Sequence, residues 1–229
     1  MLLAIDTATR FASIALYDTR GVVAEQSWRS DNNHSVEVPP AIASLLALEG
    51  QTPGALTGVA VAKGPGSFTG LRIGMSLAKG LCMALDIPIV AIPTLDIVTF
   101  AAGDPGTPVL AVLEAGRGRI CVGSYSFEEG LPQLDGDIDL VRASEWIVDA
   151  HEPVFVTGEI SAELADQLLA QPDGDNIAIS SLAGSVRRAG YLGELAWERI
   201  QNGQIDDLDT LGPLYAHYPG SGTAKRTGT

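Results

Sequence analysis

The chain opens with short stretches in which apolar residues are continuous or alternate with polar ones, and turns separate these stretches. Leu2–Ile5 has the pattern of a short buried strand. Ala12–Tyr17 and Val22–Trp28 predict two more strands, with Asp18–Gly21 as the turn between them. Three successive strands joined by short loops favour an antiparallel meander.

A helical spacing of apolar residues replaces this pattern after the third strand, at Val38, Ile42, Leu45 and Leu46. Two further strands are predicted, each with a helix after it: Val59–Ala62, a helix ending near Leu85, Ile87–Ile92 and the helix Thr94–Ala102. Three antiparallel strands followed by two crossover strands are typical of the ribonuclease-H-like lobe of sugar kinases, chaperone ATPases and actin. We therefore expect an α/β fold whose first lobe has this architecture.

A second α/β pattern begins after the turn cluster Gly103–Gly106. It predicts strands at Val109–Leu113, Ile120–Ser126 and Val154–Thr157. It predicts helices at Ser144–Ala150, Ser161–Ala170 and Leu182–Asn202, of which the last is the longest helix. We expect a first lobe in residues 1–102 and a smaller α/β lobe in 103–219, with the last helix able to pack back on the first lobe. Residues 220–229 predict a flexible tail. The expected fold class is a two-lobed actin-like ATPase fold with mixed sheets flanked by helices.

Composition and charge narrow the function classes. The 229 residues include two cysteines, so a reducing compartment is expected. There is no apolar run as long as the roughly 20 residues that span a bilayer and no signal-peptide pattern, and we therefore expect a cytoplasmic protein without membrane contact. A formal net charge of −14 repels a phosphate backbone, so any contact with nucleic acid should run through a partner.

The segment Asp6-Thr7-Ala8-Thr9 lies at the bend between the first two predicted strands. Actin-like ATPases place an Asp-x-Gly-Ser/Thr hairpin here, whose aspartate organises a metal ion and whose glycine lets backbone N–H groups approach a phosphate. Ala8 replaces that glycine, and its Cβ should hinder the approach. The alternative interpretation is a strand end followed by an Asx or ST turn.

A glycine-rich loop, Lys63–Gly70, joins the fourth predicted strand to its helix. Such a loop can cradle an anion at the helix N-terminus, with Ser67 or Thr69 as the N-cap. No Gly-Lys-Ser/Thr comes after it, so this is not a P-loop. The two segments together give the candidate residues of a vestigial nucleotide or phosphate loop, which are Asp6, Thr7, Thr9, Gly64, Gly66 and Ser67.

The helix after this loop carries small residues every four positions, at Gly70, Gly74 and Ala78. Residues at this spacing share one helix face, and small side chains there let another backbone come close. Two interpretations fit the spacing: tight packing within the chain, or a surface for a partner.

Three motifs, with their spacing, resemble the TsaB (YeaZ) family. They are Asp6–Thr9, His34-Ser35 before a helix that contains Pro40, and Gly64–Gly74, which reads GPGSFTGLRIG. The second half resembles the family less: Glu114–Ile120 departs from the family pattern Asp-Ala-Arg-x-Gly-Glu-Val, whereas Leu214-Tyr215 is similar to its closing Val-Tyr.

The resemblance implies a non-catalytic subunit that binds and activates TsaD, the enzyme that forms threonylcarbamoyladenosine in tRNA next to the anticodon. It implies pairing through first-lobe helices, so the expected partner interface comprises Gly70, Arg72, Gly74, Leu77, Ala78 and Leu81. It further implies TsaE as an additional component. Independently of the resemblance, we expect a homodimer through the same small-residue face when the chain is alone, and the net charge predicts contact with tRNA only through the complex.

Catalytic relatives of this fold bind a metal through two histidines four residues apart, on one helix face. The chain has only His34, His151 and His217, and Val38 stands four residues after the first. These histidines are expected to be capping or surface residues. It also has no Gly-Gly pair to form the second-lobe turn that packs on adenosine.

We therefore expect that the chain has no catalytic residue, binds no metal and has no cofactor of its own. Binding of ATP or ADP at the junction between subunits remains an alternative. Three alternatives remain. One is an independent actin-like-fold ATPase or small-molecule kinase that uses Asp6. The others are a metallopeptidase, and a homodimer with no other partner.

Overall fold

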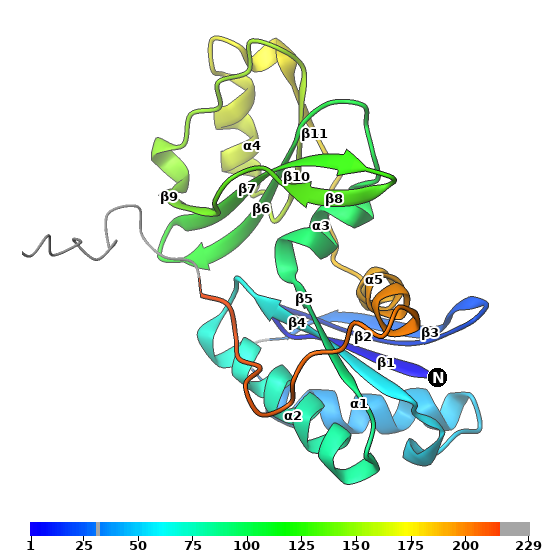
Figure 1. The fold of residues 1–229 in the computed structure, drawn as a ribbon. Coiled ribbons are helices and arrows are strands. Elements are labelled where there is room, and N and C mark those ends of the chain that lie inside the picture. Colours follow the sequence, from blue (N-terminus) through cyan, green and yellow to red (C-terminus); the bar gives the residue numbers. More distant parts are fainter. Residues whose placement is uncertain (31–32, 216–229) are drawn as a thin grey trace, which may run out of the picture.

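The computed structural model describes residues 1–30 and 33–215, which form two α/β lobes, one above the other in Figure 1. The predicted tail, 220–229, lies outside the described residues. The helices are α1 (His34–Leu48), α2 (Phe68–Leu85), α3 (Thr94–Ala102), α4 (Ala162–Leu169) and α5 (Ala189–Gln201). In the described ranges, none of them combines the length and apolarity that crossing a membrane requires.

The first lobe is built on a five-stranded sheet in the order β3-β2-β1-β4-β5. Its strands are β1 (Leu2–Asp6), β2 (Phe11–Asp18), β3 (Gly21–Arg29), β4 (Gly58–Gly64) and β5 (Ile89–Pro93). β1, β2 and β3 pair antiparallel, whereas β4 and β5 add in parallel. Tight turns allow only antiparallel pairing and helical crossovers allow parallel pairing, so the predicted meander with two crossover strands is confirmed.

Helices cover both faces of this first sheet, which explains why its strands are apolar on both sides. Along β1, Leu3 and Ile5 point to the face covered by α1 and α2. Leu2 and Ala4 point to the opposite face, which α5 covers (Figure 1). A helix from the end of the sequence therefore completes the core of the first lobe.

The second lobe has a six-stranded sheet in the order β11-β10-β6-β7-β8, and β9 pairs with β7 off this path. Its strands are β6 (Val109–Gly116), β7 (Arg119–Glu128), β8 (Leu131–Leu134), β9 (Asp139–Arg142), β10 (Val154–Gly158) and β11 (Ile177–Ile179). α3 packs on one face through Leu95 and Val98, and α4 packs on the other through Leu164 and Leu168. α3, which comes directly after the last strand of the first sheet, thus packs Leu95 and Val98 in the second lobe, while its Ile97 belongs to the first-lobe core.

Two helix predictions in the second half were wrong. Residues 144–150 are not a helix: a short 3₁₀ turn, Ala143–Glu145, is followed by a non-helical segment. Two glutamines replace the helical hydrogen bonds there. Gln171 accepts from the Val148 N–H, and Gln167 donates to the backbone carbonyls of Ala143 and Trp146. Strands β8, β9 and β11 were not predicted.

The last helix begins at Ala189 rather than Leu182, and α2 is longer. The backbone of Arg188, just before it, is extended. The glycines within α5 have a packing role. A Cβ on Gly193 would lie 3.1 Å from the Tyr17 Cβ, and one on Gly190 would lie 2.7 Å from a Val22 methyl. Glycine at these positions lets α5 approach β2 and β3 closely.

Candidate functional site

The hairpin between β1 and β2 holds the first candidate residues. Asp6 ends β1 and accepts a hydrogen bond from the Ala8 N–H at 2.8 Å, which is an Asx turn. Thr7 donates from its hydroxyl to the carbonyl of Gly70 at 2.8 Å. Asp6, Thr7 and Thr9 are all buried. The Thr7 side chain, a predicted ligand residue, therefore bonds the hairpin to the glycine-rich loop instead.

The glycine-rich loop packs on that hairpin. A Cβ on Gly66 would lie 2.2 Å from the Ala8 carbonyl oxygen, and a Cβ on Gly70 would lie 2.2 Å from the Thr7 carbonyl oxygen. The Ser67 N–H donates to Ala8 O at 2.6 Å, and the Gly64 N–H donates to the Thr94 hydroxyl at 3.1 Å. Because the chain itself uses these N–H groups, they are not available to cradle a phosphate. Ser67 does serve as the N-cap of α2.

Arg187, which sequence analysis did not single out, lies where the hairpin faces the second lobe. Its Nε donates to the Asp6 carboxylate at 2.9 Å, and its Nη1 donates to the Glu159 carboxylate. Its Nη2 donates to the Thr9 hydroxyl at 2.8 Å and to the Phe11 carbonyl at 3.3 Å. The Arg187 side chain is only 3% exposed. It therefore joins elements that are distant in sequence and belong to both lobes.

Charge balance accounts for the burial of this guanidinium. Burial by itself lowers the pKa of Arg187, but the carboxylates of Asp6 and Glu159 outweigh that effect and raise the pKa above its ordinary value. Glu159 also accepts from the Thr9 hydroxyl and from the Glu114 N–H. A metal ion with a bound phosphate does not fit these residues, since a fixed positive charge already bonds the oxygen atoms that would coordinate the metal.

The small-residue face of α2 does not form a partner surface. Gly70, Gly74 and Ala78 are buried against the first lobe's own core, and a Cβ on Gly74 would lie 2.3 Å from the Thr7 hydroxyl oxygen. Their assignment to the partner interface was wrong, because Gly70 and Gly74 are needed for close packing of α2 on the hairpin and Ala78 packs in the first-lobe core. Arg72, by contrast, is exposed, and Leu77 and Leu81 are partly exposed.

An apolar groove of about 440 Å³ lies between α1 and α2. Its walls are Ser35, Pro39, Phe68, Thr69, Arg72, Ile73, Ser76 and Leu77. At one end, the Arg72 guanidinium lies 3.9 Å from the centre of the Phe68 ring, and Tyr215 stacks on Phe68 at 5.3 Å between ring centres. Arg72 also donates to the Tyr215 hydroxyl at 3.1 Å. The groove therefore ends in an arginine whose position is fixed by two aromatic rings.

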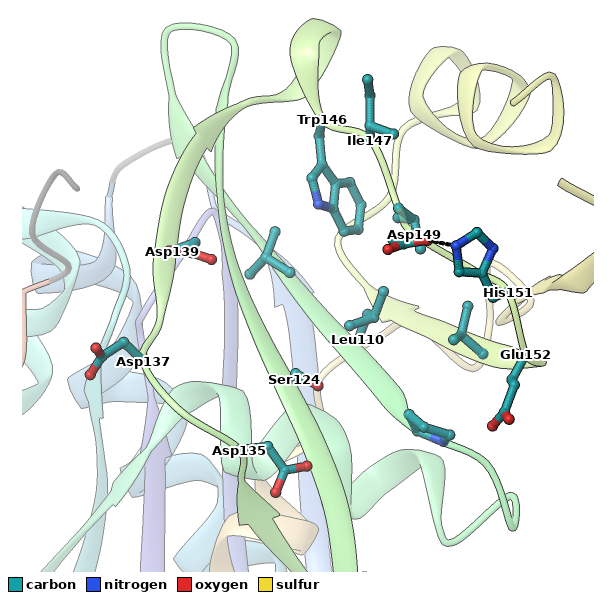
Figure 2. Close-up of a pocket in the computed structure, with 14 residues that line it drawn as sticks. Leu110, Ser124, Asp135, Asp137, Asp139, Trp146, Ile147, Asp149, His151 and Glu152 are labelled. Atoms are coloured by element: carbon teal, nitrogen blue, oxygen red, sulfur yellow. Dashed lines mark ion pairs between the residues drawn. The ribbon is translucent and has the colours of Figure 1, made fainter. Parts of the chain in front are cut away.

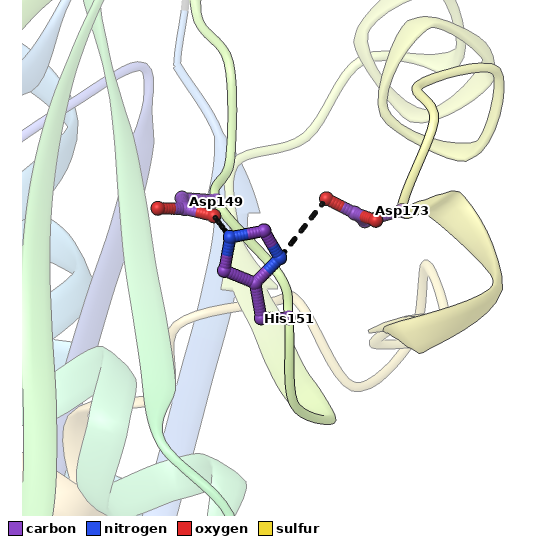
Figure 3. A group of neighbouring side chains, drawn as sticks. All are labelled: Asp149, His151 and Asp173. Carbon is purple, nitrogen blue, oxygen red and sulfur yellow. Dashed lines mark ion pairs between the residues drawn. The ribbon is translucent and has the colours of Figure 1, made fainter.

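The histidines do not form the paired arrangement of the catalytic relatives. His34, predicted to be a capping or surface residue, is buried at the start of α1 and donates from Nε2 to the Thr9 carbonyl at 2.9 Å. His151 is exposed and lies between two carboxylates (Figure 3), with Nε2 3.0 Å from Asp149 and Nδ1 3.8 Å from Asp173.

A cavity of about 610 Å³ lies in the second lobe, and His151 is among its lining residues (Figure 2). Its acidic lining residues are Asp135, Asp137, Asp139, Asp149 and Glu152. Trp146 and Ile147 line its upper part in the view of Figure 2. No lysine or arginine is among its lining residues in the described chain, so the pocket is strongly negative.

The loop at Glu114–Ile120 is a tight connection between two strands. β6 runs to Gly116 and β7 begins at Arg119, so most of the predicted loop is paired backbone. Arg117 and Gly118 have positive φ angles of 56° and 70°. The segment lines a pocket with Arg10 and Glu159 at the edge of the lobe junction.

Each lobe has a mixed sheet flanked by helices, and a hairpin of the first sheet faces the end of a strand of the second. This is the organisation of the actin-like ATPase fold. A crystal structure of a Pseudomonas aeruginosa protein described as similar to the peptidase YeaZ matches the chain with a TM-score of 0.78 and 25% identity, covering 94% of this chain and 99% of that one. YeaZ from Pseudomonas aeruginosa matches with a TM-score of 0.75 at 23% identity over 93% and 98% of the two chains. The predicted fold class is confirmed.

Sequence comparisons assign the family within this fold. The family model of TsaD, tRNA N6-adenosine threonylcarbamoyltransferase, matches residues 9–137. A tRNA threonylcarbamoyladenosine biosynthesis protein TsaB from Bacillus subtilis is 33% identical over 93% of both chains. The Escherichia coli TsaB is 33% identical over 56% of both chains. The chain belongs to the TsaB family.

Proposed function

We propose that the chain is the subunit that binds TsaD and supports the formation of threonylcarbamoyladenosine in tRNA, without catalysing the transfer itself. The relatives from Bacillus subtilis and Escherichia coli are named for the biosynthesis of this nucleoside. The observation that carries the pairing is the exposed apolar groove between α1 and α2. The remaining predicted interface residues, Arg72, Leu77 and Leu81, lie on α2.

A partner lobe of the same architecture suits this groove. The TsaD family model matches residues 9–137, which include both α1 and α2. Two related lobes can pack helix pair against helix pair about a pseudo-two-fold axis, as two copies of one chain do about a true axis. The same groove therefore serves a homodimer when the chain is alone, and TsaD displaces the second copy. TsaE and tRNA reach the chain only through this complex.

The end of the groove has the composition of an interface centre. Aromatic residues and arginines carry most of the binding energy in many interfaces, especially where they are held rigidly. Phe68 is 55% exposed although it is a large apolar side chain, and Arg72 lies over its ring. Covering this pair removes apolar area from water while the guanidinium gains a carboxylate or carbonyl partner.

The alternative of an independent ATPase or kinase requires an open phosphate site next to Asp6. That aspartate bonds Arg187, and Ala8 stands where a glycine would admit a phosphate. We therefore expect no turnover of ATP by the isolated chain. A nucleotide at the subunit junction would have to be held by surfaces that the complex creates.

Static light scattering after gel filtration tests the pairing, with this chain and the TsaD of its own organism. Ser76→Arg, at an exposed groove position, should block the groove without touching the core. The matched control is Ser144→Arg, at an exposed position of the second lobe. We expect the wild type and the control to form a one-to-one complex with TsaD and Ser76→Arg to elute separately.

Two results contradict the proposal in different ways. If the wild type does not associate with TsaD, with or without ATP and TsaE, the partner function is wrong. If Ser76→Arg pairs as well as Ser144→Arg, the function stands and the groove is the wrong surface.

A further inference from the structure

Polar contacts between the two lobes converge on one side chain, Arg187, in the segment just before α5. On the first lobe it bonds Asp6, Thr9 and the Phe11 carbonyl, and on the second lobe it bonds Glu159, next to the last residue of β10. The guanidinium is almost completely enclosed. This buried group, together with the direct hydrogen bond from the Thr9 hydroxyl to Glu159, connects the β1–β2 hairpin of the first sheet to the end of a strand in the second.

The atoms around the guanidinium are all oxygens: two carboxylates, a hydroxyl and a carbonyl. Oxygen sets of this kind are what hard divalent cations prefer. Asp6 stands where nucleotide-binding members of the fold use an aspartate to organise a metal. The site thus has the ligands of a cation site, and an arginine of the chain bonds them instead.

We propose that Arg187 is a built-in cation that takes the place of a metal–phosphate group between the lobes and fastens the lobes to each other without a ligand. The planar guanidinium suits this role, because its five N–H donors point in fixed directions and reach several acceptors at once. Its positive charge also keeps Asp6, which is buried, and Glu159, which is partly exposed, from facing each other as two unpaired carboxylates.

Removal of the Arg187 side chain should have two effects if it acts as a cation. Asp6 and Glu159 then repel each other in a site of low dielectric, and the lobes separate at the hairpin. A divalent cation added from solution restores the missing positive charge, because the four oxygen atoms remain. An arginine that only fills space would produce neither effect.

The neighbouring arginine provides a matched control. Arg188 bonds Glu25 on β3 with two hydrogen bonds, at 2.8 and 2.6 Å, and both residues belong to the first-lobe face that α5 covers. Its guanidinium also lies 5.8 Å from the centre of the Tyr191 ring, on α5 itself. Arg188→Ala therefore removes the same charge and an ion pair at the adjacent position, where the arginine side chain is 54% exposed, but leaves the link between the lobes intact.

The experiment compares wild type, Arg187→Ala and Arg188→Ala by hydrogen–deuterium exchange and by thermal unfolding, each with EDTA and with millimolar MnCl₂. With EDTA, we expect exchange of residues 6–11 and 158–161 to rise about tenfold in Arg187→Ala only. Mn²⁺ should reverse that rise and increase the Tm of Arg187→Ala by on the order of 3 °C. In the wild type and Arg188→Ala, Mn²⁺ should not change the exchange of residues 6–11 and 158–161.

Wild-type exchange at both segments in Arg187→Ala would overturn the fastening of the lobes. A raised exchange that Mn²⁺ does not reverse would overturn the cation replacement. If Arg187→Ala does not fold, Arg187→Lys tests the link between the lobes. A lysine ammonium is compact and cannot reach Asp6, Thr9 and Glu159 at once, as the three nitrogens of the guanidinium do. Wild-type exchange in that variant likewise contradicts the proposal.

Discussion

The lobe junction at Asp6 and the groove between α1 and α2 share one segment of chain, residues 64–72, but their surfaces differ in kind. At the junction, Ser67 and Gly70 bond the hairpin, and Asp6, Glu159 and Arg187 form ion pairs in which Asp6 and Arg187 are buried and Glu159 is 15% exposed. In the groove, Phe68 and Arg72 are exposed and face water. A surface whose polar groups are already bonded within the chain has little to offer a ligand, whereas an exposed apolar surface gains by being covered.

Substitutions of two glycines on α2 should have the largest effect on stability, because only one of the two glycines packs against the hairpin. Gly70→Ala should destabilise the fold by about 2–3 kcal/mol, since its Cβ would meet the Thr7 carbonyl oxygen at 2.2 Å. Gly80→Ala, on the same helix but with nothing within 4 Å, should stabilise it by about 0.5–1 kcal/mol. Urea unfolding followed by circular dichroism measures both. Equal effects would mean that α2 does not pack on the hairpin in this way.

Tyr125→Phe extends the comparison, through pH, to another internally bonded polar contact, which joins β7 to α3. The Tyr125 hydroxyl donates to Asp96 of α3 at 2.8 Å. Burial raises the pKa of Asp96 above its ordinary 3.8, and the Tyr125 hydrogen bond opposes that rise. The contribution of Asp96 to stability is therefore complete below the ordinary pKa and is lost as pH rises through the raised value.

Loss of the Tyr125 hydroxyl removes the opposing bond, so the pKa of Asp96 should rise further. We expect Tyr125→Phe to lose about 1–2 kcal/mol relative to wild type at neutral pH. The deficit should shrink toward pH 4, where Asp96 becomes protonated. Urea unfolding across this pH range tests the sign. A deficit that grows on acidification would show that the carboxylate is not the cause.

Arg72→Ala should have the smallest effect on the fold and a clear one on pairing. The side chain is exposed, so we expect a change of less than about 0.5 kcal/mol in the free energy of unfolding. Loss of the guanidinium over Phe68 should weaken binding of TsaD about tenfold, measured by titration calorimetry. Arg20→Ala, a change at another exposed arginine, serves as the control. Equal TsaD affinity in the two variants would remove Arg72 from the interface.

Local patterns in the sequence predicted the first lobe well. The short turns predicted the antiparallel meander, and Ser67 was one of the two residues predicted to cap the start of α2. Spacing also identified Gly70, Gly74 and Ala78 as one close-packing face, but periodicity cannot say whether the neighbouring backbone belongs to the same chain. The structure supplies that information, because Thr7 contacts this face.

The junction itself was only half predictable. Asp6 and Thr9 lie in a recognisable hairpin, whereas Arg187 is 181 positions from Asp6 and stands in no local motif. Its neighbours Val186 and Ala189 continue an apolar pattern, which led to a helix being predicted through it. The one available signal was an arginine pair at the start of an otherwise apolar stretch in a chain with a net charge of −14.

A guanidinium that belongs to the chain has no dissociation constant. A bound nucleotide leaves its site when its concentration falls, and the angle between two lobes then depends on the ratio of ATP to ADP. Arg187 is present at every site at all times, and the entropy of bringing the charge there was lost once, during folding. On this view the lobe angle is independent of the energy state of the cell, and the chain offers its partner a surface of constant shape.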